Sequence, residues 1–144
     1  MQNFRKVTDN FYVAPQLTAD DMHVAKEEGF EAFIMNRPDR ETPDQPPTQD
    51  LVSVAEEYGL PFLHIPITAP PSPHDIAATQ QAISDLSGKK ILAFCRSGTR
   101  SVTLWAYAMA AGKTEDVGTI LNQARDAGYD LSPHRSQLQA LYDQ

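Results

Sequence analysis

The sequence has one cysteine and no long hydrophobic run. One cysteine cannot form a disulfide within the chain, so we expect its thiol to be free. Residues 1–6 lack the apolar segment of a signal peptide, and no stretch approaches the roughly 18 apolar residues of a membrane-spanning helix. These absences lead us to expect a soluble, cytoplasmic protein that makes no membrane contact.

Basic residues are also scarce, with 12 lysines and arginines against 19 aspartates and glutamates and a net charge of −7. Such a chain has no electrostatic reason to bind nucleic acid or anionic lipid over a broad surface. The segment between Asp85 and Glu115, however, contains five basic residues and no acidic one, so it carries +5 and the rest of the chain −12. The cysteine lies in this segment, which therefore predicts a site for one small anion.

Metal ligands and nucleotide-binding glycines are few as well. The histidines are His23, His64, His74 and His134, and no pair of them has the spacing of metal ligands. The segment around the cysteine contains one glycine, which is too few for a nucleotide-binding fingerprint. We therefore expect neither a metal nor a cofactor.

Apolar segments alternate with capped helices along the chain. Strands are predicted at 4–7, 10–14, 30–35, 61–67 and 90–94. Helices are predicted after the caps Thr18, Thr48 and Ser72, and over 101–111, 114–127 and 133–142. The alternation predicts one α/β domain over 1–144, with a mainly parallel sheet flanked by helices on both faces. Ligands of such sheets lie outside the carboxyl ends of the strands, where the loops 37–40, 68–72 and 95–100 are expected.

The loop 95–101 (CRSGTRS) follows a predicted strand and precedes an apolar helix. Its backbone N–H groups can form an anion-binding nest at the helix N-terminus. Because a helix N-terminus and nearby arginines favour the thiolate form, we predict that Cys95 is a reactive thiolate at neutral pH. The alternative, a buried cysteine that only fills space, does not explain the two arginines, the glycine and the three hydroxyls that follow it.

The loop residues receive different expected roles. Cys95 and Arg100 are the predicted catalytic residues, with Arg100 gripping the anion through two hydrogen bonds. The rest of the predicted anion-binding loop is Arg96, Ser97, Gly98, Thr99 and Ser101. Arg96 either assists Arg100 or points into solvent, and Ser101 either assists the thiolate or satisfies backbone donors at the helix start.

Arg37 follows the strand at 30–35, at the predicted ligand-binding edge of the sheet. It could contact an anionic substrate. With equal weight, it could form a salt bridge to Asp39 or Glu41.

A cysteine and an arginine that flank a glycine-containing loop resemble the signature shared by cysteine-dependent phosphatases and rhodanese sulfurtransferases. The chain from 11–16 (FYVAPQ) through 95–101 to 127–131 (AGYDL) resembles the beta-lactamase-hydrolase-like, phosphatase-like family, which is also described as a family of sulfur transferases. The resemblance implies a protein tyrosine phosphatase-like fold. It leaves the reaction divided between the two chemistries.

Departures from the phosphatase pattern favour sulfur transfer. That pattern has five residues between Cys and Arg and a His before the Cys, whereas this loop has four residues there and Phe94 before Cys95. A shorter loop offers fewer N–H donors, which suits a sulfane sulfur better than a phosphoryl group. Phosphatases also use an Asp as general acid at a position that falls here on Ala69. Asp75 is a weak candidate for that acid, since it is better explained as a helix N-terminal residue.

We therefore expect a sulfurtransferase in which Cys95 takes sulfane sulfur as a persulfide. The acceptor is an external thiol, because the chain has no second cysteine. The alternatives are a phosphomonoester hydrolase that uses the same Cys95 and Arg100, and a non-catalytic persulfide carrier or sensor. The expected ligand is a small sulfur-containing or phosphate anion.

Overall fold

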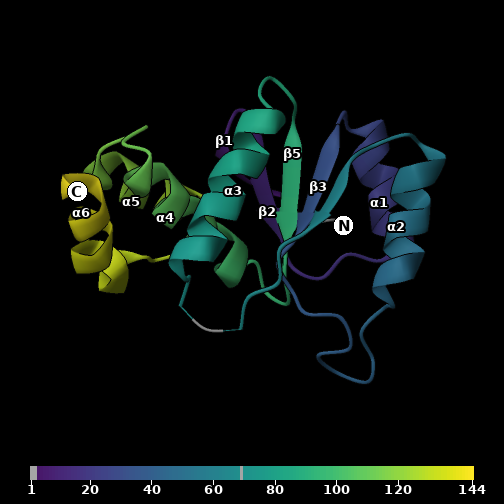
Figure 1. The fold of residues 1–144 in the computed structure, drawn as a ribbon. Helices are drawn as coiled ribbons and strands as arrows, with labels where there is room; N and C mark the ends of the chain where they lie inside the picture. The colour runs from purple at the N-terminus through teal and green to yellow at the C-terminus, as the bar shows by residue number, and fades with distance from the viewer. Residues whose placement is uncertain (1–2, 69) are drawn as a thin grey trace.

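The computed structural model describes residues 3–68 and 70–144. Five strands form one sheet in the order β1-β2-β5-β3-β4 (Figure 1). The strands are β1 (Arg5–Thr8), β2 (Phe11–Ala14), β3 (Ala32–Met35), β4 (Phe62–His64) and β5 (Ile91–Phe94). Only β1 runs antiparallel to its neighbour, so the carboxyl ends of the other four strands share one edge of the sheet. This confirms the predicted mainly parallel sheet.

Central strands β3 and β5 are buried at every position, as expected for strands that are covered on both faces. The strands predicted at 4–7, 10–14, 30–35 and 90–94 are observed within two residues at each end. The prediction at 61–67 was too long, because β4 ends at His64. Pro66 has no N–H and interrupts the ladder, although the Ile65 N–H still donates to the carbonyl of Met35 at the end of β3 and the Ile67 N–H to that of Asn36.

Helices cover both faces of the sheet (Figure 1). The first face is covered by α1 (Ala19–Glu27) and α2 (Thr48–Glu57), over a core that includes Met22, Phe33 and Leu51. The second face is covered by α3 (Pro73–Asp85), α4 (Thr99–Ala111) and α5 (Val117–Asp126). Helix α6 (Arg135–Asp143), preceded by a 3-10 turn at Ser132–His134, packs against α4 and α5. No helix in the described part of the chain is long and apolar enough to cross a bilayer.

Local capping decides where several helices begin. Thr18 caps α1 and Ser72 caps α3, each through a reciprocal pair of side-chain bonds with an aspartate three residues later, as predicted. Thr48 is not a cap, because it is already the first residue of α2 and its hydroxyl donates to Asp39 at 2.8 Å. Asp116 accepts the Thr119 N–H at 2.8 Å and so starts α5 three residues later than expected.

Candidate active site

Cys95 follows β5 at the carboxyl edge of the sheet and is fully buried. The chain then turns through three residues and enters α4 at Thr99. The Gly98 N–H donates to the Cys95 Sγ at 3.1 Å. The sulfur therefore faces a backbone donor at the start of a helix, where the partial positive charge of the helix N-terminus stabilises an anion.

Gly98 gives the loop its tight turn. Its φ of +92° lies in the left-handed region, which favours glycine. A Cβ at this position would meet the hydroxyl of Tyr129, which donates to the Ser97 carbonyl at 3.0 Å. Burial raises the pKa of Tyr129, so that the hydroxyl keeps the proton it donates. Tyr129 thus holds the loop from outside, although the sequence did not single it out.

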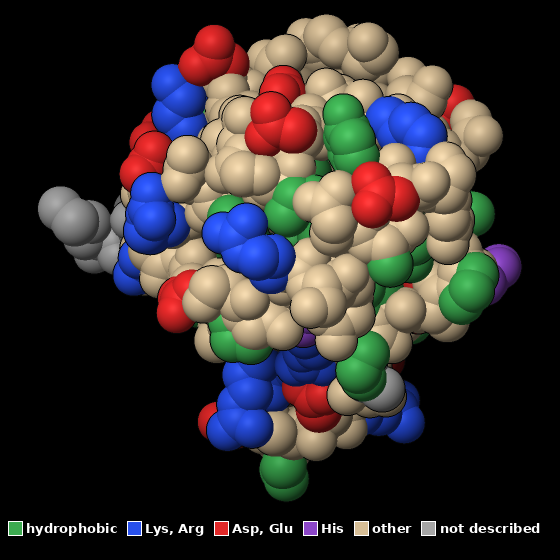
Figure 2. Space-filling view, turned by 90° about the vertical axis from the view of Figure 1, so that its left-hand side faces the viewer, with side chains coloured by type: hydrophobic (Ala, Val, Ile, Leu, Met, Phe, Trp, Pro, Cys, Tyr) green, Lys and Arg blue, Asp and Glu red, His purple; other side chains and the backbone are tan. Residues whose placement is uncertain are grey.

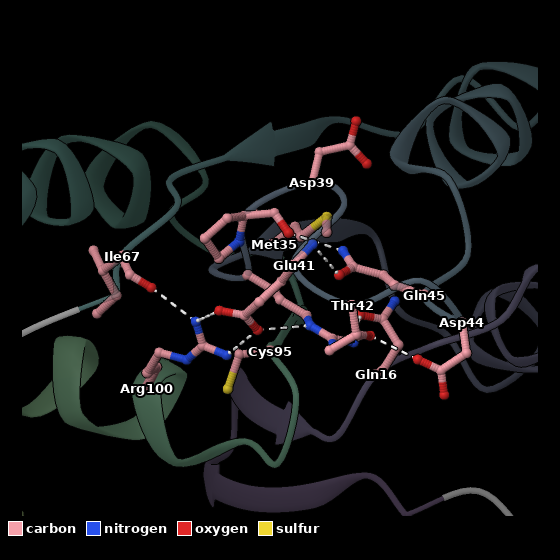
Figure 3. Close-up of polar contacts among 12 residues, drawn as sticks. Gln16, Met35, Asp39, Glu41, Thr42, Asp44, Gln45, Ile67, Cys95 and Arg100 are labelled. Carbon is pink, nitrogen blue, oxygen red and sulfur yellow. Dashed lines mark hydrogen bonds and ion pairs between the residues drawn. The ribbon is translucent and has the colours of Figure 1, made fainter.

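Arg100, on the first turn of α4, lies between the Cys95 sulfur and the carboxylate of Glu41 (Figure 3). Its Nη1 donates to Glu41 Oε2 at 2.8 Å and to the Ile67 carbonyl at 2.9 Å, and its Nη2 donates to Glu41 Oε1 at 2.8 Å. The Glu41 carboxylate, and after it the Cys95 sulfur, raises the pKa of Arg100. The two residues predicted to be catalytic are therefore together.

Arg37 is 4% exposed and does not have a free guanidinium for a substrate. Its Nε donates to Glu41 at 2.9 Å. Its Nη1 donates to Gln16 and its Nη2 to Thr42, both at 3.0 Å. The expected contact of Arg37 with a substrate is therefore not observed, and the alternative expectation, a salt bridge to Glu41, is confirmed. The reason is burial, because a buried guanidinium must place its donors on nearby acceptors.

Glu41 is the residue of the site that the sequence suggested only as a possible partner of Arg37. It belongs to the β3–α2 loop, residues 36–47, which lies below the sheet in the view of Figure 1. Hydrogen bonds from Arg100 and Arg37 lower the pKa of its carboxyl from 4.5 to about 2, although partial burial acts in the opposite direction. Glu41 is therefore ionised at neutral pH and bridges the two arginines.

The remaining loop residues differ in exposure. Arg96, Ser97 and Thr99 are exposed, and the Ser97 hydroxyl donates to that of Thr99 at 3.1 Å. Ser101 is 1% exposed, and its hydroxyl has no hydrogen-bond partner in the described part of the chain. In Figure 2, basic and acidic side chains lie side by side on the narrow lower part of the molecule, just below its wider upper part. Arg100, and not Arg96, is the arginine at the sulfur.

The sequence offers two positions for a phosphatase general acid, 69 and 75. Ala69, at the first of them, lies outside the described residues. The carboxylate of Asp75 accepts the Ser72 N–H at 3.0 Å in the capping box of α3. Among the described residues, moreover, no three His, Cys, Asp or Glu side chains are grouped so that they could hold a metal ion.

Known proteins of similar sequence belong to one family. The family model described as "Beta-lactamase hydrolase-like protein, phosphatase-like domain" matches residues 3–112. The chain is 29% identical over 127 residues to the beta-lactamase hydrolase-like protein of Agrobacterium fabrum strain C58. This match covers 88% of the chain but 29% of that protein, so the chain spans less than a third of the length of this relative.

Solved structures show the same fold. A candidate phosphatase from Neisseria meningitidis Z2491 has a TM-score of 0.82 and 32% sequence identity, covering 98% of this chain and 99% of that one. Tk-PTP in its active form has a TM-score of 0.75 at 19% identity, covering 99% and 97%. The sheet and helices described above are thus those of the protein tyrosine phosphatase-like fold, as the sequence resemblance implied.

Substituting alanine for Gly98 should destabilise the protein more than the same change at Gly29. Both glycines have a φ of +92°, but a Cβ at Gly29 would meet no atom within 4 Å. Gly29→Ala therefore carries only backbone strain, about 1–3 kcal/mol. Gly98→Ala adds a clash with Tyr129, which we expect to cost about 2 kcal/mol more. Urea unfolding measures the difference, and equal losses would contradict the close approach of Tyr129.

The Glu41 ion pairs should make stability depend on pH in an acidic window. The pKa of Glu41 is lower in the folded protein, so ionised Glu41 stabilises the fold above 4.5 and this contribution is lost as pH falls toward about 2. The difference in unfolding free energy between wild type and Glu41→Gln should therefore be constant above about pH 5 and shrink below 4.5. Urea titrations at several pH values measure it, and a difference that stays constant down to pH 2 would refute the ion pairs.

Proposed function

The chain belongs to the family of phosphatase-like domains of beta-lactamase hydrolase-like proteins, and on this premise we propose that it is a cysteine-dependent enzyme that transfers sulfane sulfur. Cys95 is the nucleophile in this proposal. Arg100 and the loop N–H groups hold the anion, and a thiol from outside the chain accepts the sulfur.

The observation that carries the proposal is the charge of the carboxylate beside Arg100. Glu41, with a pKa of about 2, has no proton to give to a leaving alkoxide at neutral pH. Asp75 is engaged at the start of α3, and position 69 is an alanine. A sulfane-sulfur donor releases a thiolate or sulfite, which is a far better leaving group than an alkoxide and departs without a general acid.

The first half-reaction transfers a sulfur atom to the enzyme. The Cys95 thiolate attacks the outer sulfur of a donor R–S–SH, the S–S bond of the donor breaks, and R–S⁻ leaves. Cys95 then carries a persulfide, Cys–S–SH. The Gly98 N–H, 3.1 Å from Sγ, supports the negative charge on the thiolate before attack.

The second half-reaction restores the thiolate. An acceptor thiolate R′–S⁻ attacks the outer sulfur of the persulfide, the bond to the Cys95 sulfur breaks, and R′–S–SH is released. Sulfur moves between thiols without an added oxidant or reductant. Because Cys95 is the only cysteine, the persulfide has no internal thiol to react with, and the acceptor comes from outside.

Phosphomonoester hydrolysis is the second candidate, and the comparisons favour it. The matching family model describes a phosphatase-like domain, and the Neisseria relative is a candidate phosphatase. The same Cys95 and Arg100 would form and break a phosphoenzyme. The candidates make opposite predictions for two simple substrates.

Incubation with glutathione persulfide should add one sulfur atom to the protein, measured by intact mass. Cys95→Ser should abolish the adduct, because serine does not form a persulfide, and added cyanide or thiol should remove the sulfur with turnover. A chromogenic aryl phosphate run in parallel should be hydrolysed slowly or not at all. Aryl phosphate hydrolysis that is lost in Cys95→Ser, together with no sulfur adduct, would favour the phosphatase. An adduct that no acceptor removes would contradict catalytic sulfur transfer and would indicate a non-catalytic persulfide carrier.

Replacement of Asp75 by asparagine separates its capping role from that of an acid. The amide keeps an acceptor oxygen for the Ser72 N–H, so we expect at most about 1 kcal/mol of destabilisation. The rates with both substrates should stay within about twofold of wild type. A general acid would instead account for about 10²-fold or more of aryl phosphate hydrolysis. A loss of that size, confined to the phosphate substrate, would make Asp75 the acid of a phosphatase.

A further inference from the structure

We propose that Glu41 selects the sulfur donor by charge, so that the site accepts singly charged or neutral sulfane-sulfur donors and discriminates against dianions such as thiosulfate. The inference rests on the proposed sulfur transfer. It follows from three features of the site: the hydrogen-bond donors of Arg100 that remain unused, the sum of the charges around Cys95, and the contacts that fix Glu41 in place.

Arg100 has few hydrogen-bond donors left for a ligand. A guanidinium has five N–H groups. Those on Nη1 go to Glu41 and the Ile67 carbonyl, and one on Nη2 goes to Glu41. In the described part of the chain this leaves the Nε–H and one Nη2–H for the Cys95 sulfur and an incoming group. The arginine can therefore bind a small anion, but only with the side that Glu41 does not occupy.

The charges around the sulfur cancel. Arg37 and Arg100 are positive, whereas Glu41 and a Cys95 thiolate are negative, and the three ion-pair distances among the first three residues are 2.8–2.9 Å. Arg37 and Cys95 are almost entirely buried, whereas the side chains of Arg100 and Glu41 are 23% and 24% exposed, so solvent screens the cluster only in part. An approaching donor therefore meets a cluster with no net charge. A second negative charge on the donor is then repelled by Glu41 and the thiolate without additional attraction to offset it.

Glu41 is fixed in place from its own loop as well as by the arginines. Its N–H donates to Gln45 Oε1 at 2.9 Å, and Gln45 Nε2 donates to the Pro38 carbonyl at 2.9 Å. Gln45 is itself buried. Because the carboxyl remains ionised at neutral pH and its backbone is braced, its charge is a permanent part of the site.

The test compares two donors of nearly the same shape. Methanethiosulfonate and thiosulfate both carry a sulfane sulfur, but a methyl group replaces one charged oxygen in the first. Wild type should have the higher kcat/KM with methanethiosulfonate. Glu41→Gln keeps an acceptor oxygen for Arg100 and removes one charge, so it should shift the ratio of the two kcat/KM values toward thiosulfate by about tenfold.

Asp44→Asn is the matched control. Asp44 lies in the same loop and accepts from the Thr42 hydroxyl at 2.7 Å but does not contact Arg100, so its replacement should shift the ratio much less than Glu41→Gln does. An unchanged ratio in Glu41→Gln, or an equal fall with both donors, would overturn the charge selection. Equal shifts in Glu41→Gln and Asp44→Asn would also overturn it, since they would indicate that the charge of the whole loop, and not Glu41 in particular, sets the ratio.

A binding measurement separates this inference from the proposed function. Sulfate and methanesulfonate differ by the same charge and transfer no sulfur, and each should slow the alkylation of Cys95 by iodoacetamide when bound. Methanesulfonate should protect wild type better than sulfate does, and Glu41→Gln should reverse or remove that preference. This result without a persulfide adduct would refute sulfur transfer but support the charge selection, whereas an adduct without the preference would do the opposite.

Discussion

The contact between Arg100 and Glu41 joins the two loops on which the site depends. Arg100 lies in the first turn of the helix that follows Cys95, whereas Glu41 belongs to the loop that follows the neighbouring strand β3. The contact is bidentate and is extended by Arg37, which is buried and donates a hydrogen bond from each of its three guanidinium nitrogens. Loss of Glu41 would be costly chiefly because the buried guanidinium of Arg37 would lose its charged partner.

This network sets the electrostatic environment of the Cys95 loop. The loop itself favours anions, since the helix N-terminus and the Gly98 N–H both face the sulfur. Glu41 offsets that preference with a negative charge that does not titrate near neutral pH. The Glu41 carboxylate, being ionised, offers no proton to a leaving group. Those properties support the proposed transfer of sulfur between thiols, whereas the phosphatase-like family model and the Neisseria structure favour phosphomonoester hydrolysis.

The fold supplies the rigidity that the site needs. Strands β3 and β5 are adjacent and buried, so the β3–α2 loop and the Cys95 loop emerge side by side at the carboxyl edge. Helix α4 is buried along most of its length, which fixes Arg100 at its first turn. Tyr129 approaches the turn at Gly98 from the segment that follows α5. The Cys95 loop is thus held from the sheet, from its own helix and from the C-terminal part of the chain.

The sequence by itself determined what depends on neighbouring residues. The short apolar strands, the capping boxes of Thr18 and Ser72, and the Cys95 loop before an apolar helix are all visible in local patterns. Only the tertiary structure decided that Arg37 is buried against Glu41, that Glu41 reaches Arg100, and that Tyr129 covers Gly98. Glu41 and Arg100 are 59 residues apart. Their contact arises because parallel strands bring their carboxyl ends to one edge, and no local pattern encodes which side chains meet there.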